Sequence, residues 1–371
     1  MRILKQSKGI GLFSVLYLCC VLLATISCST DENELKPEPE QKYTLTLSIN
    51  PENGGEVSGE GEYLEGKEVS VMASPGEYYK FINWLDEESN IVSEDSSFTF
   101  TMPDHNVTLT AELDKSLKYK IHFIDVGQGD AILITTHEKV LLVDGGWRTS
   151  NVAGYLSQQG IDEIDYVIAT HPHADHIGGL IEVFNTYTIG EVIDPGVNHT
   201  TITYNDYLTA IDENDIPYTE GKKGMQRDLG KDAYFEILHP PDPIPNYSNS
   251  YLNNVSVVAR VTLGEITVML TGDIEKEGEA DLVAATENLS AHILKVAHHG
   301  SHSSSTMEFL EAVEPEISII MCGQNNQYGH PHQQTLDNLN DIGTEIYRTD
   351  IHGHIIINIF ENEYEVITQN N

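Results

Sequence analysis

The chain has 371 residues, a length that allows two or three domains with ample hydrophobic cores. Asp and Glu outnumber Lys and Arg by 58 to 20, which gives a formal net charge of −38. A field of this sign repels nucleic acids and anionic lipid surfaces, so composition argues against a general nucleic-acid-binding protein.

Residues 1–27 predict a signal peptide. A basic start at Arg2, Lys5 and Lys8 precedes an apolar run over residues 10–26. The alternative is an uncleaved signal anchor, because the run is close to the ~20 residues that cross a bilayer.

Thr25-Ile26-Ser27-Cys28 resembles a bacterial lipobox, with Cys28 as the lipidated residue. The acidic stretch that follows resembles surface-export signals of Gram-negative lipoproteins. Residues 28–42 then predict an extended tether that contains two prolines. We therefore expect an exported lipoprotein, held by its lipid in the outer membrane or at the cell surface.

Residues 43–114 predict an all-β module, because short alternating stretches are separated by turn residues. The Gly-Gly-x-Val, Phe81-x-x-Trp84 and Met102-Pro103 patterns resemble the InlB-type bacterial-repeat module. Phe81 and Trp84 are expected in its core. The resemblance implies a spacer or adhesion module without catalytic residues.

Residues 118–371 predict a larger domain in which strands and helices alternate after three consecutive strands. Cys322 ends a buried strand and is expected in the core. Strands are expected at 119–125, 131–135, 139–144, 165–169, 191–193, 234–238, 256–263, 265–271, 293–297, 317–321 and 354–359, and helices at 152–159, 177–183, 204–213, 275–285, 306–312 and 333–339.

A dense set of metal-binding side chains follows the strand at 165–169. His171, His173, Asp175 and His176 lie within six residues, on a predicted strand-to-helix turn. Imidazole and carboxylate together suit Zn²⁺, and also Mn²⁺ or Fe. The alternating positions can direct His171 and His173 to one ion, and Asp175 and His176 to a second.

The His-x-His-x-Asp-His pattern resembles the metal motif of the metallo-β-lactamase superfamily. Four further segments, at 123–131, 270–273, 296–301 and 328–332, resemble in the same order the hydrolase domain of ComEC competence proteins. The resemblance implies an α/β fold, a four-layer αββα sandwich that binds two divalent metal ions. It does not extend to the polytopic membrane portion of ComEC.

Further site residues follow from strand ends and from this resemblance. Asp273 is expected to bridge the two ions; helix capping is the alternative. Asp144 would accept a proton from a liganding imidazole, unless it is a simple turn residue. His298 and His299 follow one strand and should diverge, so we expect His299 to bind metal and His298 to face substrate.

The remaining candidates surround the substrate. Ser301 and Ser303 lie on a polar loop suited to a phosphate, or on an ordinary surface loop. His330 is a candidate to bind substrate or donate a proton. Asn253 and Asn254 occupy the region where many superfamily members have another metal-binding His, and His239 is the alternative replacement.

The expected activity is hydrolysis of a phosphodiester by a metal-bound hydroxide, with Asp175, His298 and His330 as the catalytic residues. Alternatives are a ComEC-type DNA nuclease, a carboxylic ester, lactone or amide hydrolase, and a non-catalytic surface module. Residues 118–371 contain 12 Lys and Arg against 38 Asp and Glu, a net charge of −26. The substrate is therefore expected to be a small or cell-envelope phosphodiester rather than DNA. The lipid would bind the membrane, and no obligate protein partner is inferred.

Overall fold

The computed structural model describes residues 40–76, 79–285, 288–360 and 363–370. The predicted signal peptide, Cys28 and most of the tether lie outside these residues. No helix among the described residues has the length and hydrophobicity needed to cross a membrane.

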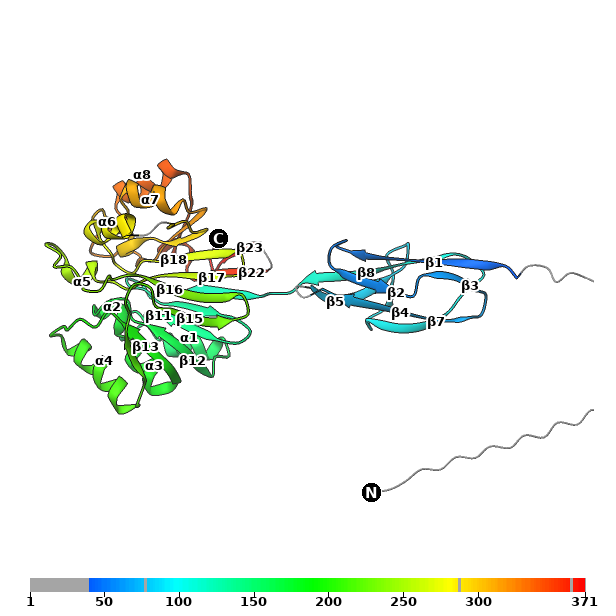
Figure 1. The fold of residues 1–371 in the computed structure, drawn as a ribbon, viewed down its shortest axis with the longest axis horizontal. Helices are drawn as coiled ribbons and strands as arrows, with labels where there is room; N and C mark the ends of the chain where they lie inside the picture. Colours follow the sequence, from blue (N-terminus) through cyan, green and yellow to red (C-terminus); the bar gives the residue numbers. More distant parts are fainter. Residues whose placement is uncertain (1–39, 77–78, 286–287, 361–362, 371) are drawn as a thin grey trace, which may run out of the picture.

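The N-terminal part is a β-sandwich that lies beside the larger domain (Figure 1). Its larger sheet has the order β3-β1-β8-β5-β6, and its smaller sheet has the order β2-β4-β7. Trp84 is fully buried between the sheets, as expected, while Phe81 is partly buried against it. The strands are β1 (Lys42–Asn50), β2 (Gly55–Ser58), β3 (Gly61–Leu64), β4 (Glu68–Pro75), β5 (Tyr79–Leu85), β6 (Ile91–Ser93), β7 (Ser97–Thr101) and β8 (Val107–Lys115).

The larger domain contains two sheets. One has the order β14-β13-β12-β11-β10-β9-β22-β23, and the other has the order β15-β16-β17-β18-β19-β20-β21. The strands of the first sheet are β9 (Tyr119–Phe123), β10 (Ile132–Thr135), β11 (Val140–Val143), β12 (Glu163–Ile168), β13 (Thr188–Asp194), β14 (Tyr218–Glu220), β22 (Ile355–Ile359) and β23 (Tyr364–Thr368). Those of the second are β15 (Gln226–Gly230), β16 (Ala233–His239), β17 (Val258–Leu263), β18 (Ile266–Leu270), β19 (Ile293–Lys295), β20 (Ile317–Ile320) and β21 (Glu345–Arg348).

Three apolar cores show that these elements form four layers. The first core joins the two sheets, through residues such as Ile121 and Phe235. The second packs helices α1 (Val152–Gln158), α3 (Leu180–Thr186) and α4 (Ile202–Glu213) on the first sheet. The third packs α6 (Lys276–Ala285), α7 (Met307–Val313) and α8 (Gln333–Ile342) on the second sheet. Figure 1 shows the two helix groups on opposite sides of the strands, which confirms the predicted αββα sandwich.

Short helices and turns complete the domain. α2 (Ala174–Ile177), α5 (Tyr251–Asn254), the 3₁₀ helix η1 (Ala297–Gly300) and α9 (Thr349–His352) each span four residues. Cys322 is fully buried in the third core, as expected, and burial raises the pKa of its thiol to about 12.

The basic residues between Lys222 and Lys231 do not all lie in a solvated loop. Arg227 lies on β15, which pairs with β16, and its guanidinium donates two 2.8 Å hydrogen bonds to Glu191 of β13. The pair therefore links β15, at the edge of the second sheet, to β13, which lies next to the edge strand β14 of the first. Strand β15 was not predicted because its polar residues lack an apolar alternation.

Candidate metal centre

The predicted metal motif lies where β12 ends and α2 begins. Two glycines divide the predicted helix at 177–183 into α2 and α3. A Cβ on Gly179 would lie 2.0 Å from the Gly145 carbonyl oxygen, and one on Gly178 would lie 2.5 Å from the Arg148 amide nitrogen. Only glycine permits this contact between the turn and the loop after β11.

The first group of donor atoms contains His171, His173 and Asp273. His171 Nε2 lies 2.9 Å from His173 Nδ1 and 3.9 Å from Asp273 Oδ2. His171 Nδ1 faces Thr170 Oγ1 at 3.1 Å, and that hydroxyl donates to Asp144 at 2.7 Å. The hydroxyl oxygen therefore accepts a hydrogen bond from Nδ1–H of His171. In this tautomer Nε2 is unprotonated, and its lone pair can bind a metal ion.

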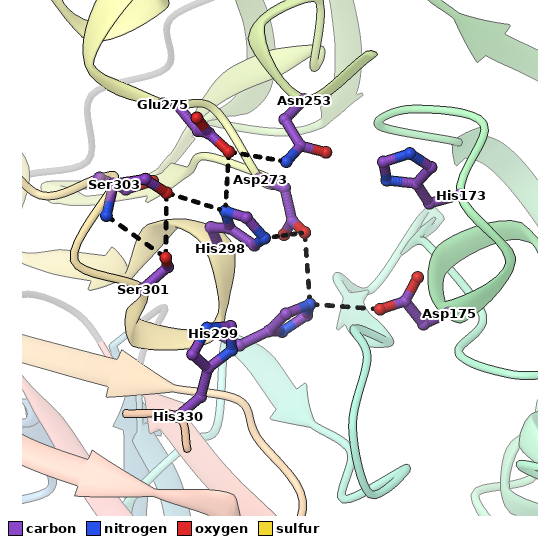
Figure 2. Close-up of polar contacts among 12 residues, drawn as sticks. His173, Asp175, Asn253, Asp273, Glu275, His298, His299, Ser301, Ser303 and His330 are labelled. Atoms are coloured by element: carbon purple, nitrogen blue, oxygen red, sulfur yellow. Dashed lines mark hydrogen bonds and ion pairs between the residues drawn. The ribbon is translucent and has the colours of Figure 1, made fainter. Parts of the chain in front are cut away.

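The second group contains Asp175, His176 and His299, and it shares Asp273 with the first. Figure 2 shows Asp175, His299 and Asp273 of this group. His299 Nε2 lies 3.3 Å from Asp273 Oδ2 and 3.5 Å from Asp175 Oδ2. His176 Nε2 lies 3.4 Å from Asp273 Oδ2. Ligands about 2.0–2.1 Å from a tetrahedral ion lie roughly 3.3 Å apart, so these separations match a shared ion.

Hydrogen bonds on the outer side of the imidazoles fix their tautomers. His176 Nδ1 donates to Asp144 Oδ2 at 2.7 Å, and His299 Nδ1 donates to the Met321 carbonyl at 2.8 Å. Each Nε2 then carries the lone pair that a metal ion needs. Asp144 occupies the position predicted from its place after β11.

Several donor atoms of this cluster are buried without a hydrogen-bond partner. They include His176 Nε2, His299 Nε2 and Asp273 Oδ1. Such groups are costly unless an additional partner satisfies them. Since the two imidazole nitrogens are atoms that converge on Asp273 Oδ2, the residues fit divalent metal ions, in accord with the fold.

A buried ion pair that sequence analysis missed lies beneath these groups. Lys295, on β19, is fully buried. Its ammonium group pairs with Asp130 and donates a hydrogen bond to the Gly272 carbonyl at 3.0 Å. Lys295 Nζ also lies 3.8 Å from Asp273 Oδ1. Burial lowers the pKa of Lys295, but Asp130 and Asp273 outweigh that effect and raise it.

Gly129 allows Asp130 to reach this position. A Cβ on Gly129 would lie 2.3 Å from the Asp175 carbonyl oxygen, to which the Asp130 amide donates at 3.2 Å. The only sequence signal was the glycine pair around Gln128.

His298 has a carboxylate partner of its own. Its Nδ1 lies 3.2 Å from Glu275 Oε1, and its Nε2 lies 3.8 Å from Asp273 Oδ2 (Figure 2). Asn253 Nδ2 donates to Glu275 Oε1 at 2.9 Å. His298 and His299 both have left-handed backbones, with φ of 50° and 56°, so their side chains diverge as predicted.

A cavity of about 350 Å³ opens beside the donor groups. His298, His330 and Asn253 line it together with His173 and Asp175. Other lining residues are Gln128, Trp147, His199, Thr201 and Tyr328.

His330 is positioned from the opposite side of the cavity. Its Nδ1 lies 3.4 Å from Gln128 Nε2, while the Gln128 carbonyl oxygen accepts the Gly323 amide at 3.2 Å. Burial, with the nearby His299 and His298, lowers the pKa of His330 to about 4. His330 is therefore neutral at pH 7.

Three predicted substrate-binding residues do not line this cavity. Asn254 Oδ1 accepts the backbone amides of Glu275 and Gly278, so its side chain secures the beginning of α6. Ser301 Oγ lies 2.9 Å from Ser303 Oγ, which lies 3.3 Å from His298 Nδ1. These serines contact each other and His298, and their predicted phosphate-binding role stays a prediction.

His239 does not take part in the donor groups. Its Nδ1 lies 3.0 Å from the Ser256 carbonyl oxygen, and its Nε2 lies 2.8 Å from the Tyr247 hydroxyl. Burial lowers its pKa to about 4. Both nitrogens have partners, so His239 does not replace an imidazole at the metal centre.

Two domain families match this chain. Residues 45–116 match the divergent InlB B-repeat domain, and residues 124–243 match the metallo-beta-lactamase superfamily. The chain is 32% identical over 256 residues to ComE operon protein 3 of Bacillus subtilis, and 28% identical over 277 residues to Recombination protein 2 of Haemophilus influenzae. These matches confirm the resemblances to the InlB-type repeat, to the metallo-β-lactamase superfamily and to ComEC proteins.

The alignments cover 64% and 73% of this chain but 32% of each relative, so the chain spans about a third of their length. Solved structures with a similar fold include CmlA, a diiron beta-hydroxylase from Streptomyces venezuelae (TM-score 0.43, 12% identity, 67% of this chain and 55% of that one). Another is the metallo-beta-lactamase fold protein YhfI from Bacillus subtilis (TM-score 0.41, 13% identity, 62% of this chain and 96% of that one).

Proposed function

We propose, on the premise that this chain carries a metallo-β-lactamase superfamily domain related to ComEC-type proteins, that it is a phosphodiesterase with two divalent metal ions. The observation that supports this most directly is the convergence of two donor groups at Asp273 Oδ2, in the second of which His176 Nε2 and His299 Nε2 are buried without a hydrogen-bond partner. Bound ions would supply Lewis-acid activation of water and of a phosphoryl oxygen. Zn²⁺ suits the mixed imidazole and carboxylate donors, and Mn²⁺ or Fe are alternatives.

His171, His173 and Asp273 would hold one ion. Asp175, His176 and His299 would hold the other, again with Asp273. Asn253 stands where a further imidazole is common in the superfamily, and its amide donates to Glu275 instead. The first position therefore has one strong ligand fewer than the second.

His298 is the proposed proton donor to the leaving oxygen. Glu275 accepts from Nδ1 and stabilises the imidazolium, while Nε2 faces the cavity beside Asp273. His330 enters from the opposite side and is suited to donate a hydrogen bond to a phosphoryl oxygen. Asp175 acts through its position in the second donor group.

A DNA nuclease is the second candidate, because one relative is named Recombination protein 2 and another Competence protein ComA. The net charge of −26 over residues 118–371 weighs against binding of long DNA. Arg227, the only arginine of the 222–231 stretch, already donates two hydrogen bonds to Glu191, so its guanidinium is not free to bind a DNA phosphate. We therefore favour small or cell-envelope phosphodiesters.

A substrate panel tests this proposal. With Zn²⁺ or Mn²⁺, we expect bis-p-nitrophenyl phosphate to be hydrolysed in preference to p-nitrophenyl phosphate, a lactone, a β-lactam and single- or double-stranded DNA. His173→Ala should lower kcat/KM by more than about 100-fold, beyond the range for residues that only support a ligand. Efficient DNA cleavage at physiological salt, abolished by the same change, would establish the nuclease instead. Preferred lactone or β-lactam turnover would defeat both.

We also propose that the chain is exported and anchored through a lipid on Cys28. The Cys28→Ala variant should no longer partition with membranes, because it lacks the thiol to which the anchoring lipid would be attached. Fractionation of cells that express the full chain measures this. Continued membrane association of the variant would identify residues 10–26 as an uncleaved anchor.

A further inference from the structure

Two large aromatic side chains line the cavity and remain open to solvent. Trp147, in the loop after β11, is 39% exposed, and Tyr328, in the loop between β20 and α8, is 49% exposed. They come from loops that follow different sheets. Exposed aromatic rings beside a cavity are suited to stack on a planar group of a ligand.

The backbone under each ring is held in place. The Trp147 carbonyl carbon would lie 3.0 Å from a Cβ on Gly178, so the loop packs directly on the metal-binding turn. The Tyr328 amide donates to Asn326 Oδ1 at 3.1 Å, and its ring stacks on His330 with centroids 5.7 Å apart. The backbone of Trp147 is therefore held against the metal-binding turn, and the ring of Tyr328 is held beside His330.

The lining of the cavity contains no basic side chain other than histidine. Among the described residues, no Lys or Arg lines it. Its side chains there include imidazoles, amides, carboxylates and aromatic rings. Positive charge for a phosphate would therefore come from the metal ions of the proposed function, and the aromatic rings are left to contact the rest of the substrate.

The cavity volume of about 350 Å³ is near the lower end of ligand-binding sites, which run from about 300 to 1,000 Å³. This space suits one phosphoryl group with one ring rather than a folded polymer segment.

We infer that the cavity selects a phosphodiester that carries a planar aromatic ring, and that Trp147 and Tyr328 are the specificity-determining residues. This inference rests on the proposed function and adds the substrate class to it. The ring can belong to a nucleobase or to a phenyl group, because both present the same flat face to a stacked aromatic side chain.

Tryptophan fluorescence gives a test that does not depend on turnover. The chain has two tryptophans, and Trp84 is fully buried in the N-terminal sandwich. Changes in emission on ligand binding should therefore arise from Trp147. Probes are a phosphorothioate-linked thymidine dinucleotide, methyl phenyl phosphate and diethyl phosphate, each added to the metal-loaded full chain.

We expect both ring-bearing probes to quench emission, and diethyl phosphate to displace them only at about tenfold higher concentration, since stacking strengthens binding of a ring. Trp147→Leu should lose the quenching, and Tyr328→Leu should weaken the ring-bearing probes about tenfold without weakening diethyl phosphate. Tyr234→Leu is the matched control, because Tyr234 is 38% exposed on β16 and does not line the cavity. The stronger of the two ring-bearing probes identifies the source of the ring.

Equal affinity for all three probes, or unchanged binding in Tyr328→Leu, would overturn the inference while the phosphodiesterase proposal stands. If bis-p-nitrophenyl phosphate is not hydrolysed and none of the probes binds, the proposed function fails and the inference falls with it.

Discussion

Replacing His173 and Asp273 together by alanine should remove nearly all bound metal from the chain. Asp273 Oδ2 lies within 3.3–3.9 Å of donor atoms in both groups, so its loss weakens both positions. His173 faces His171 at 2.9 Å, and its loss leaves the first position with one imidazole. Elemental analysis after dialysis should fall from up to two ions per chain to a small fraction of one.

His302→Ala is the control for this experiment. His302 is an exposed histidine whose Nδ1 lies 3.1 Å from His332 Nδ1, and neither belongs to the donor groups. Its replacement should leave the metal content unchanged. Full metal occupancy in the double variant would show that the ions bind elsewhere.

The second large effect should come from Lys295→Met, which leaves the Asp130 carboxylate buried without its cation. Breaking a buried pair by removing one partner costs about 3–5 kcal/mol. Asp130 is 1% exposed, and its remaining neighbours at 3.4–3.9 Å are His299 and His176. Urea unfolding followed by circular dichroism should show a loss of this size in the free energy of unfolding.

Two further variants check that the buried charge is the cause. Lys295→Met combined with Asp130→Asn should recover most of the lost stability, because neither charge is then left unpaired. Lys276→Met, on the exposed side of α6, should change stability by less than about 0.5 kcal/mol. A single Lys295→Met variant within 1 kcal/mol of the parent would contradict the role of the pair.

The predicted elements were those whose signals are local. The strands around 140–143 and 317–320 are continuous apolar runs, and the turn that carries His171 to His176 is dense in metal-binding residues. Their positions, and the layers that follow from them, agree with the structure. Strands such as β15, β21 and β23 were missed because polar residues interrupt their apolar pattern.

The contacts behind the donor groups could not be predicted from local sequence signals. Lys295 stands in an apolar strand, where sequence alone gives no reason to expect its ammonium group to be buried beside Asp130. Glu275 was considered only in relation to a helix start, although it supports His298. Both pairs join residues far apart in the chain, so only the tertiary structure reveals them.

The pairing of β22 with β9 has a consequence for how this chain acquires its structure. Ile355 lies opposite Phe123 and Ile359 opposite Tyr119, so nearly the last strand of the chain completes the sheet beside the first strand of the larger domain. Until that segment is available, one edge of β9 is unpaired, and contacts so distant in sequence form slowly. Folding of the larger domain therefore finishes only after synthesis of the chain is nearly complete. A polypeptide that must cross a membrane before folding would profit from this delay, and it would depend on holding chaperones to protect the open edge.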